Sequence, residues 1–381
     1  MKTVGIICEY NPLHLGHKKQ LDAVRQAYPD AAIVCVMSGN FVQRGKPAIV
    51  DKSMRARAAL LCGADLVLEL PVTAALSSAE CFAAEGVRIL SVLCDILCFG
   101  AETPDADALM ATASALLSPA FSDRLREKLD SGLSFPAARQ SALEDIGIQS
   151  TVSSPNDILA TEYCKAILSQ GSAMRPMVIR REGSYHDEAP HSENPSATAV
   201  RKLMLESGMW LDYVPNAARD CFREAKLHTL DAGERAILAR LRTMPDEEFE
   251  ALPHGSEGLW RKFMHNARRF ADLEDILTAT KSKRYTRTRL DRMAMCAFLG
   301  ITRQQLASPA PYVRVLGFTD RGRSLLRKHK ETFPFRNAGD RIDDPYQALE
   351  DRCGDLYGLF SLSQPEAPGA ESRRRVVYVH E

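Results

Sequence analysis

The chain has 381 residues, of which 45% are hydrophobic and 26% are charged, and its 49 basic residues balance its 49 acidic residues. These values are those of an ordinary soluble protein with two or three domains and ample apolar material for a core. Because the net charge is zero, a nucleic-acid partner would have to bind a local basic patch rather than the protein as a whole.

Ten cysteines are scattered along the chain without a C-x-x-C pair, so neither a zinc site nor a disulfide framework is indicated. The N-terminus has no signal-peptide pattern, and no apolar run approaches the roughly 20 residues that a membrane-spanning helix needs. We therefore expect a cytoplasmic protein with no membrane partner and no resident metal.

Over the first hundred residues, apolar runs alternate with segments of helical periodicity. The runs that predict buried strands cover residues 4–8, 31–37, 66–68 and 95–99. Strands that alternate with helices predict an α/β fold with a mostly parallel, Rossmann-like sheet. Ligands of such sheets bind beyond the carboxyl ends of the strands, so we expect the loops that follow these runs to converge there.

The loop after the first predicted strand contains a His-x-Gly-His pattern formed by His14 and His17. Asn11-Pro12 ends the strand and helical spacing begins near Gly16, so both histidines are expected in the loop beside a helix N-terminus. A helix N-terminus attracts phosphate, and two imidazoles can donate hydrogen bonds to phosphoryl oxygens. The pattern is similar to that of nucleotidyltransferases that transfer an adenylyl group from ATP. A solvated pair of loop histidines is the alternative.

Two other nucleotide-binding patterns are excluded. Five residues separate Gly39 from Gly45 where a P-loop needs four, and Pro47 replaces the Mg-binding Ser or Thr. No Gly-x-Gly-x-x-Gly fingerprint follows the first predicted strand. We therefore set aside P-loop enzymes and dinucleotide-dependent dehydrogenases.

Residues 104–148 have a helical pattern, Ser154-Pro155-Asn156-Asp157 is a helix start, and residues 177–179 form a short apolar run. A further helix opens with Ser196, Thr198 and Arg201. Hydroxyl and N–H groups at a helix start can hold phosphate oxygens, and an arginine there can hold a leaving pyrophosphate. The alternative is a plain N-cap with a solvated arginine.

From residue 216 to about residue 307 the pattern is helical, and it contains the one dense basic cluster in the sequence. Its candidate RNA-binding residues are Lys281, Lys283, Arg284, Arg287 and Arg289, with Tyr285 available to stack on a base. A solvated helix face is the alternative. We predict three domains: a nucleotidyltransferase domain at 1–208, a mainly helical domain with the candidate RNA-binding cluster at 209–310, and a small α/β extension at 311–381 that ends in a strand.

Several longer blocks occur in one order along residues 1–320. They are EYNPLHLGH at 9–17, MSGNFVQRG at 37–45 and GADLVLELP at 63–71, followed by shorter motifs at 154–159, 185–187, 196–201 and 283–287. Together they resemble the bacterial tRNA(Met) cytidine acetate ligase family, and they are far more specific than His-x-Gly-His alone.

The resemblance implies an ATP-dependent ligase. Acetate and ATP would give acetyl-adenylate and pyrophosphate, and the amine of the wobble cytidine in elongator tRNA(Met) would then take the acetyl group to give N4-acetylcytidine. Activation is needed because acetate is a poor electrophile and the aromatic amine is a weak nucleophile. ATP is thus expected as a substrate, the need for Mg²⁺ is left open, and no protein partner is predicted.

The resemblance also assigns site residues. His14 and His17 are the expected catalytic residues, within an ATP-binding segment made of Ile7, Cys8, Glu9, Tyr10, Asn11, Pro12, Leu13, His14, Leu15, Gly16, His17, Lys18, Lys19 and Gln20. Further expected nucleotide contacts are Gly100, Asn156, Arg180, Arg181, Ser196, Thr198 and Arg201. The structural alternatives are a strand-end glycine, a helix cap at Asn156 and solvated arginines.

Two other functions stay open. An adenylyltransferase that acts on a small molecule, such as a pantetheine-phosphate or nicotinate-mononucleotide enzyme, needs no helical basic half. A non-catalytic RNA-binding protein with a vestigial nucleotide fold does not need intact histidines and Arg201.

Overall fold

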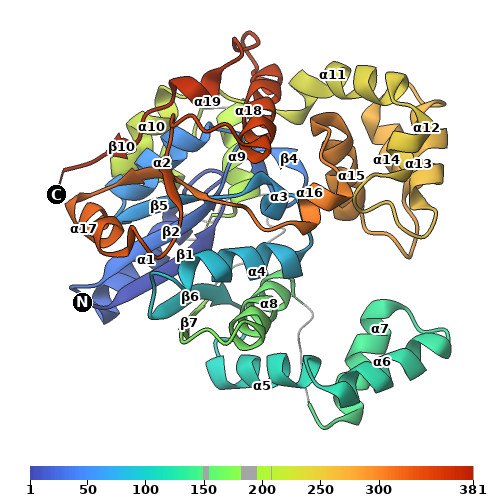
Figure 1. Ribbon diagram of the computed structural model, residues 1–381, viewed down its shortest axis with the longest axis horizontal. Coiled ribbons are helices and arrows are strands. Elements are labelled where there is room, and N and C mark those ends of the chain that lie inside the picture. The colour runs from blue at the N-terminus through green and yellow to red at the C-terminus, as the bar shows by residue number, and fades with distance from the viewer. Residues whose placement is uncertain (149–153, 182–194, 207, 381) are drawn as a thin grey trace.

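The computed structural model describes residues 1–148, 154–181, 195–206 and 208–380, and it is built around one mixed sheet (Figure 1). The sheet has eight strands in the order β10-β8-β5-β2-β1-β6-β7, with β9 paired to β8 outside this path. The five parallel strands are β1 (Thr3–Cys8), β2 (Ala32–Ser38), β5 (Leu66–Leu70), β6 (Ile96–Ala101) and β7 (Arg175–Arg180). The predicted α/β fold with a mostly parallel sheet is therefore confirmed.

The last seventy residues complete the same sheet. β8 (Val313–Phe318) runs antiparallel to β5, and β9 (Phe335–Asn337) and β10 (Val377–Tyr378) pair parallel with β8. The predicted terminal strand is confirmed as β10. The segment expected as a small extension thus forms one edge of the central sheet.

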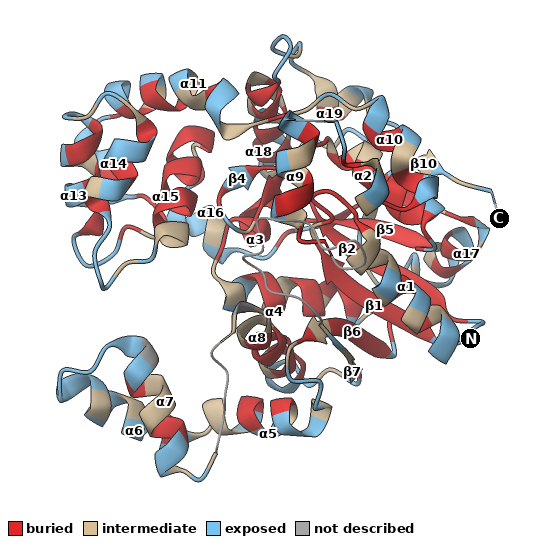
Figure 2. Cartoon of the chain, turned by 180° about the vertical axis from the view of Figure 1, so that it is seen from behind, coloured by how far each residue is buried: buried red, intermediate tan, exposed pale blue. Residues whose placement is uncertain are grey.

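Both faces of the sheet are covered by helices, which is why β1, β2 and β5 are continuous apolar runs without alternation. One face packs against residues of α1 (Leu15–Ala27), α2 (Lys52–Leu61) and α9 (Ala197–Glu206). The other face packs against α4 (Ala79–Leu90), α8 (Pro155–Ser169) and α17 (Asp320–His329). Figure 2 shows β1, β2, β5 and β6 as a buried layer between these helices.

The helical pattern at 104–148 forms three helices, α5 (Ala106–Leu116), α6 (Pro119–Asp130) and α7 (Phe135–Asp145). α5 packs on α8, whereas α6 and α7 pack on each other and lie away from the sheet (Figure 1).

The helical pattern predicted for residues 216–307 is confirmed. It contains α10 (Arg219–Arg223), α11 (Leu230–Thr243), α12 (Asp246–Glu250), α13 (Leu259–Ala267), α14 (Leu273–Thr280), α15 (Arg287–Leu299) and α16 (Arg303–Ala307). Its core also includes Phe41 and Val72 from the first hundred residues, together with residues of α18 (Pro345–Tyr357). Within the described residues, none of the helices combines the length and the apolarity that crossing a bilayer requires.

A short hairpin joins the sheet to this helical part. It consists of β3 (Phe41–Val42) and β4 (Lys46–Pro47), which pair antiparallel. Gly45 has φ +71° at the turn, and a Cβ there would lie 2.4 Å from the backbone nitrogen of Arg292 in α15. The hairpin therefore needs glycine at this position, both for its backbone conformation and for its close approach to α15.

Candidate active site

The two histidines of the His-x-Gly-His pattern lie at the start of α1. His14 is the N-cap residue, whereas His17 lies in the first helical turn rather than in the loop, which corrects the sequence-based placement. The Nδ1 atom of His14 accepts the Gly16 N–H at 3.1 Å, and the Nδ1 atom of His17 accepts the His14 N–H at 3.3 Å. The two rings stack with their centroids 3.8 Å apart. Each imidazole thus satisfies a free N–H group of the helix terminus.

These hydrogen bonds determine which nitrogen of each ring carries the proton. An Nδ1 atom that accepts a hydrogen bond is unprotonated, so in the neutral ring the Nε2 atom is the donor. Burial, together with the nearby guanidinium groups of Arg181 and Arg201, lowers the pKa of His14 to about 3. Burial, His14 and Arg181 also lower the pKa of His17 well below its ordinary value. Both rings are therefore neutral Nε2–H donors near pH 7.

The donor of His14 has no acceptor of its own. Its Nε2 atom is buried and has no hydrogen-bond partner among the described residues. A buried donor without a partner costs about 1–3 kcal/mol, so such a group is usually retained for a ligand. A phosphate oxygen at this helix N-terminus would satisfy it.

The first part of the segment 7–20 packs into the hydrophobic core. Ile7, Cys8, Tyr10 and Leu13 are buried members of the two hydrophobic clusters that flank the sheet. Asn11 is also buried, and its side-chain oxygen accepts the Ile49 N–H at 2.7 Å. These side chains fix the path of the loop, so a nucleotide would meet the backbone here rather than these side chains.

The flanks of the segment are arranged differently. Pro12 is buried, and Leu15 and Gly16 are half-buried in the first turn of α1. Lys18 pairs with Asp22 on the same helix, Lys19 is exposed, and the Gln20 side chain donates to the Cys98 carbonyl at 3.3 Å.

Arg201 joins α9 to the histidine loop. Its guanidinium donates to the Asn11 carbonyl at 2.7 Å and to the Thr198 hydroxyl at 3.0 Å. The Ser196 hydroxyl accepts the Ala199 N–H at 3.0 Å near the start of the helix. The structure thus brings the predicted Ser196, Thr198 and Arg201 group next to the His-x-Gly-His loop, and Arg201 is not a solvated side chain.

A second group lies at the ends of β6 and β7. Arg181 donates to the Asn156 side-chain oxygen at 3.3 Å, and the Asn156 amide donates to Glu102 at 2.6 Å. The N-cap of α8 is Ser154, whose hydroxyl accepts the Asp157 N–H at 3.1 Å, so the cap alternative for Asn156 is wrong. The side chain of Asn156 instead links Arg181 to Glu102.

Arg181, rather than Arg180, is the arginine whose charge affects the pKa values of His14 and His17. Consecutive side chains along a strand point to opposite faces, and it is Arg181 whose charge lowers the pKa of both imidazoles. Arg180 is exposed at the end of β7. Gly100 pairs with Ile179, and a Cβ at this glycine would meet nothing closer than 3.9 Å. Protein packing therefore does not require glycine at position 100, whereas close approach of a ligand would.

Arg55 on α2 is a supporting residue that the sequence analysis missed. Its side chain is fully buried and donates to the Val50 carbonyl at 2.8 Å and to the Glu9 carbonyl at 2.6 Å. It also donates to the Ser38 carbonyl at 3.1 Å and to the Gly39 carbonyl. One guanidinium thus fixes the loops that follow β1 and β2, which confirms that these loops converge.

The basic cluster lies at the start of α15 and in the segment before it. Arg287 binds the Glu274 carboxylate with two bonds of 2.6 Å and binds Asp291 at 2.9 Å, and Arg289 donates to the His254 carbonyl at 2.8 Å. Arg284 is exposed but pairs with Glu257 at 2.8 Å. Lys281 and Lys283 are exposed and form no ion pair within the part of the chain that the structure describes. The two lysines are therefore the cluster's most available charges.

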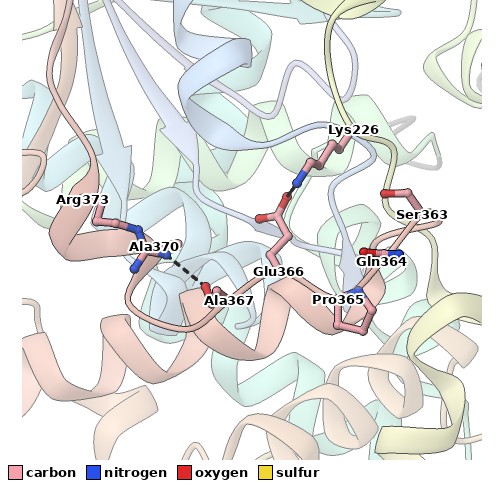
Figure 3. A pocket seen from close by; sticks show the side chains of 8 residues that line it. All are labelled: Lys226, Ser363, Gln364, Pro365, Glu366, Ala367, Ala370 and Arg373. Carbon is pink, nitrogen blue, oxygen red and sulfur yellow. Dashed lines mark hydrogen bonds and ion pairs between the residues drawn. The ribbon is translucent and has the colours of Figure 1, made fainter.

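The motif residues Tyr185, His186 and Asp187 lie outside the described residues. An open pocket of about 690 Å³ lies between Lys226 and the segment 363–373 (Figure 3). Its Lys226 pairs with Glu366 at 3.2 Å, and its Arg373 donates to the Ala367 carbonyl at 3.1 Å. None of the predicted site residues lines this pocket.

The chain is similar to known proteins along nearly its whole length. The pattern of the family described as HIGH Nucleotidyl Transferase matches residues 1–363. A tRNA(Met) cytidine acetate ligase of Clostridium perfringens is 35% identical over 389 residues, which covers 95% of this chain and 96% of that protein. The enzyme of the same name from Clostridium novyi is 37% identical and covers 87% of this chain and 88% of its own.

Solved structures with a similar fold belong to a protein of the same kind. The apo crystal structure of Thermotoga maritima TmcAL matches with a TM-score of 0.92 at 29% identity, and a second structure of that protein, bound with alpha-thio ATP, matches with a TM-score of 0.88 at 28% identity. Both cover the whole of each chain. Since the family pattern spans most of the sequence and the relatives exceed 30% identity over most of their length, the chain belongs to the HIGH nucleotidyltransferase family and, within it, to the tRNA(Met) cytidine acetate ligases.

Proposed function

We propose that the protein activates acetate with ATP and transfers the acetyl group to the wobble cytidine of elongator tRNA(Met). The observation that supports this most is the pair of neutral Nε2–H donors on His14 and His17 at the N-terminus of α1, with Arg181 and Arg201 beside them. This arrangement suits a triphosphate, because it offers oriented donors and positive charge without a titrating imidazolium.

In the first step, an acetate oxygen attacks the α-phosphorus of ATP, and the bond to pyrophosphate breaks. His14 and His17 donate to phosphate oxygens as negative charge builds on them, and Arg201 stabilises the leaving pyrophosphate. The nucleotide contacts are assigned to the segment 7–20 together with Gly100, Asn156, Arg180, Arg181, Ser196, Thr198 and Arg201. In the second step, the cytidine amine attacks the acetyl carbonyl and AMP leaves.

The tRNA is assigned to the helical part of the chain. Lys281 and Lys283 supply the exposed positive charge for the RNA backbone, Arg284 adds to it, and Arg287 and Arg289 shape the surface. We assign the ATP chemistry to residues 1–208 and tRNA binding to residues 209–310, with 311–381 completing the sheet.

Any Mg²⁺ in this reaction is proposed to bind the phosphates of ATP rather than a metal site of the protein. Among the described residues, no group of three or more His, Cys, Asp or Glu side chains is arranged to hold a metal ion. The ten cysteines are free thiols, which suits the reducing cytoplasm where tRNA is modified.

One assay tests the proposal against its alternatives. The protein is incubated with labelled acetate and a bacterial tRNA pool, with or without ATP, and the RNA is recovered and digested. We expect ATP-dependent label in N4-acetylcytidine. ATP turnover that requires a small-molecule acceptor and leaves the RNA unlabelled would indicate a small-molecule adenylyltransferase. RNA binding without turnover would indicate a non-catalytic protein.

A further inference from the structure

Glu9 is an acidic residue in the segment assigned to the nucleotide, and contact with phosphate does not explain its negative charge. It follows β1 directly, and its side chain is half-buried. A carboxylate beside a triphosphate is repulsive and therefore needs a separate physical reason. One available reason is proton transfer during the second step, in which the cytidine amine loses a proton.

The position of Glu9 is fixed at both its backbone and its side chain. Arg55 donates to the Glu9 carbonyl at 2.6 Å, and the Gln43 N–H donates to Glu9 Oε1 at 2.7 Å. The other carboxylate oxygen has no hydrogen-bond partner among the described residues. Glu9 therefore presents one oriented, free oxygen from a rigid support, as a general base requires.

Glu9 also lies at the junction of the two substrate regions. On the nucleotide side, Arg201 donates to the carbonyl of Asn11, two residues after Glu9, at 2.7 Å. The ring of Tyr10, the residue next to Glu9, lies 5.0 Å from the His17 imidazole. On the tRNA side, the hairpin that holds Glu9 contacts α15, where Arg292 donates to the Gln43 carbonyl at 3.3 Å. α15 is the helix that begins with Arg287 of the basic cluster.

We propose that Glu9 is the general base of the acetyl-transfer step, an inference that rests on the function proposed above. The N4 lone pair of the cytidine attacks the acetyl carbonyl carbon, and the new C–N bond forms. The bond between the acetyl carbon and the phosphate oxygen breaks, and AMP leaves with its electron pair. The N4 proton passes to the free oxygen of Glu9 and then to solvent, so no other reactant is needed.

The surroundings of Glu9 suit this role. Burial raises the pKa of its carboxyl above the ordinary value, which makes the carboxylate a stronger base. The groups that face it are the cations Arg44, Arg55 and Arg201, which favour the charged form, and the Tyr163 hydroxyl on α8. These cations oppose the effect of burial, so the carboxylate gains basicity without losing its electrostatic support.

The test separates the two half-reactions of the full-length protein. Glu9→Gln retains a side-chain oxygen that can accept the Gln43 N–H but cannot take up a proton. Acetate-dependent exchange of pyrophosphate into ATP reports the first step, and single-turnover transfer from enzyme-bound acetyl-adenylate to tRNA reports the second. We expect the ratio of the transfer rate to the exchange rate to fall about 100-fold in Glu9→Gln. The matched control Glu80→Gln, which changes an exposed carboxylate on α4, should leave this ratio unchanged.

The pH dependence gives a second measurement. In the wild type, the transfer rate should rise with pH through the pKa of Glu9, and this rise should be absent in Glu9→Gln. A Glu9→Gln variant that transfers acetyl at the wild-type rate would overturn the proposal, as would an equal loss of both half-reactions. If the wild type shows no acetate-dependent exchange, the proposed function fails, and the role of Glu9 fails with it.

Discussion

The imidazoles of His14 and His17 stack with their ring centroids 3.8 Å apart, and each uses its Nδ1 atom to accept a backbone N–H at the start of α1. The same contacts that begin the helix therefore orient two Nε2–H donors. Because the rings are held by the backbone, they need no reorganisation when phosphate charge develops, which is the condition for strong electrostatic stabilisation.

Replacement of His14 by Asn should stop adenylate formation without unfolding the protein. Asn is a favourable N-cap residue, so it preserves the start of α1 while removing the Nε2–H donor. We expect acetate-dependent pyrophosphate exchange to fall about 100-fold, which is the typical effect of losing one preorganised donor. The melting temperature should stay close to that of the wild type, and His329→Ala on α17 serves as the remote control. Wild-type exchange in His14→Asn would remove this histidine from the mechanism.

Protonation of His14 should affect stability but not the first step near neutral pH. The pKa of His14 is about 3 in the folded protein against an ordinary value of 6.5, so the unfolded chain binds more protons between these values. The contribution of neutral His14 to the free energy of unfolding is thus fully present above about pH 6.5 and is lost as the pH falls toward about 3. Denaturant titrations across this range should show the loss, and it should be smaller in His14→Asn.

Over the same range, the exchange rate should have no inflection near pH 6.5 that belongs to His14. An inflection there that disappears in His14→Asn would show that the imidazole titrates with its ordinary pKa, and the neutral-donor role would be wrong.

Charge reversal of Lys281 and Lys283 should weaken tRNA binding and reduce its salt dependence. Both lysines are exposed, so their loss should leave the fold intact, and the slope of log affinity against log salt should fall by about one for each lost phosphate contact. Pyrophosphate exchange should be unaffected. Lys330→Glu, which reverses an exposed charge just after α17, is the matched control. Unchanged tRNA affinity in the double variant would favour the solvated-face alternative.

Arg287 is a poor residue for that experiment. Its guanidinium is bound by Glu274 and Asp291, so charge reversal would place three acidic groups together and perturb the fold. A loss of tRNA binding in such a variant could not be attributed to the RNA contact.

Arg374 should be important for stability, because this residue just before β10 forms an ion pair with Asp51 in the first hundred residues. Arg374 binds the Asp51 carboxylate at 2.5 Å and Glu371 at 3.0 Å, and Glu371 in turn pairs with the buried Lys52 at 2.8 Å. Removal of one partner from a buried ion pair leaves the other charge uncompensated. Arg374→Ala should lower the free energy of unfolding by about 2 kcal/mol or more. The neighbouring exposed Arg373→Ala should have a much smaller effect, and equal effects in denaturant titrations would contradict this.

The central part of the fold could be predicted because its signals are local. The strands β1, β2, β5 and β6 are continuous apolar runs, and the helices between them have clear periodicity. The hairpin β3–β4 was not predicted, since two residues per strand are too few to show an alternation. The antiparallel pairing of β8 with β5 was also not predicted, because it joins residues about 250 positions apart and has no local signature.

The candidate site likewise contains residues that local motifs predict and residues whose role depends on distant contacts. The positions of His14, His17 and Arg201 follow from motifs whose residues are adjacent in sequence. The burial of Arg55 could not be predicted, since a single arginine in a helical pattern looks like a surface residue, and its acceptors are backbone carbonyls of distant loops. The internal pairing of Arg287 with Glu274 likewise depends on how α14 packs against α15.

A crystal structure of the protein with a non-hydrolysable ATP analogue is the most direct test of the role assigned to the paired histidines. The Nε2 atoms of His14 and His17 should lie within about 3.2 Å of phosphate oxygens, which is hydrogen-bond distance, with Arg201 on the same triphosphate. A nucleotide bound elsewhere, or phosphates beyond the reach of both rings, would contradict that role.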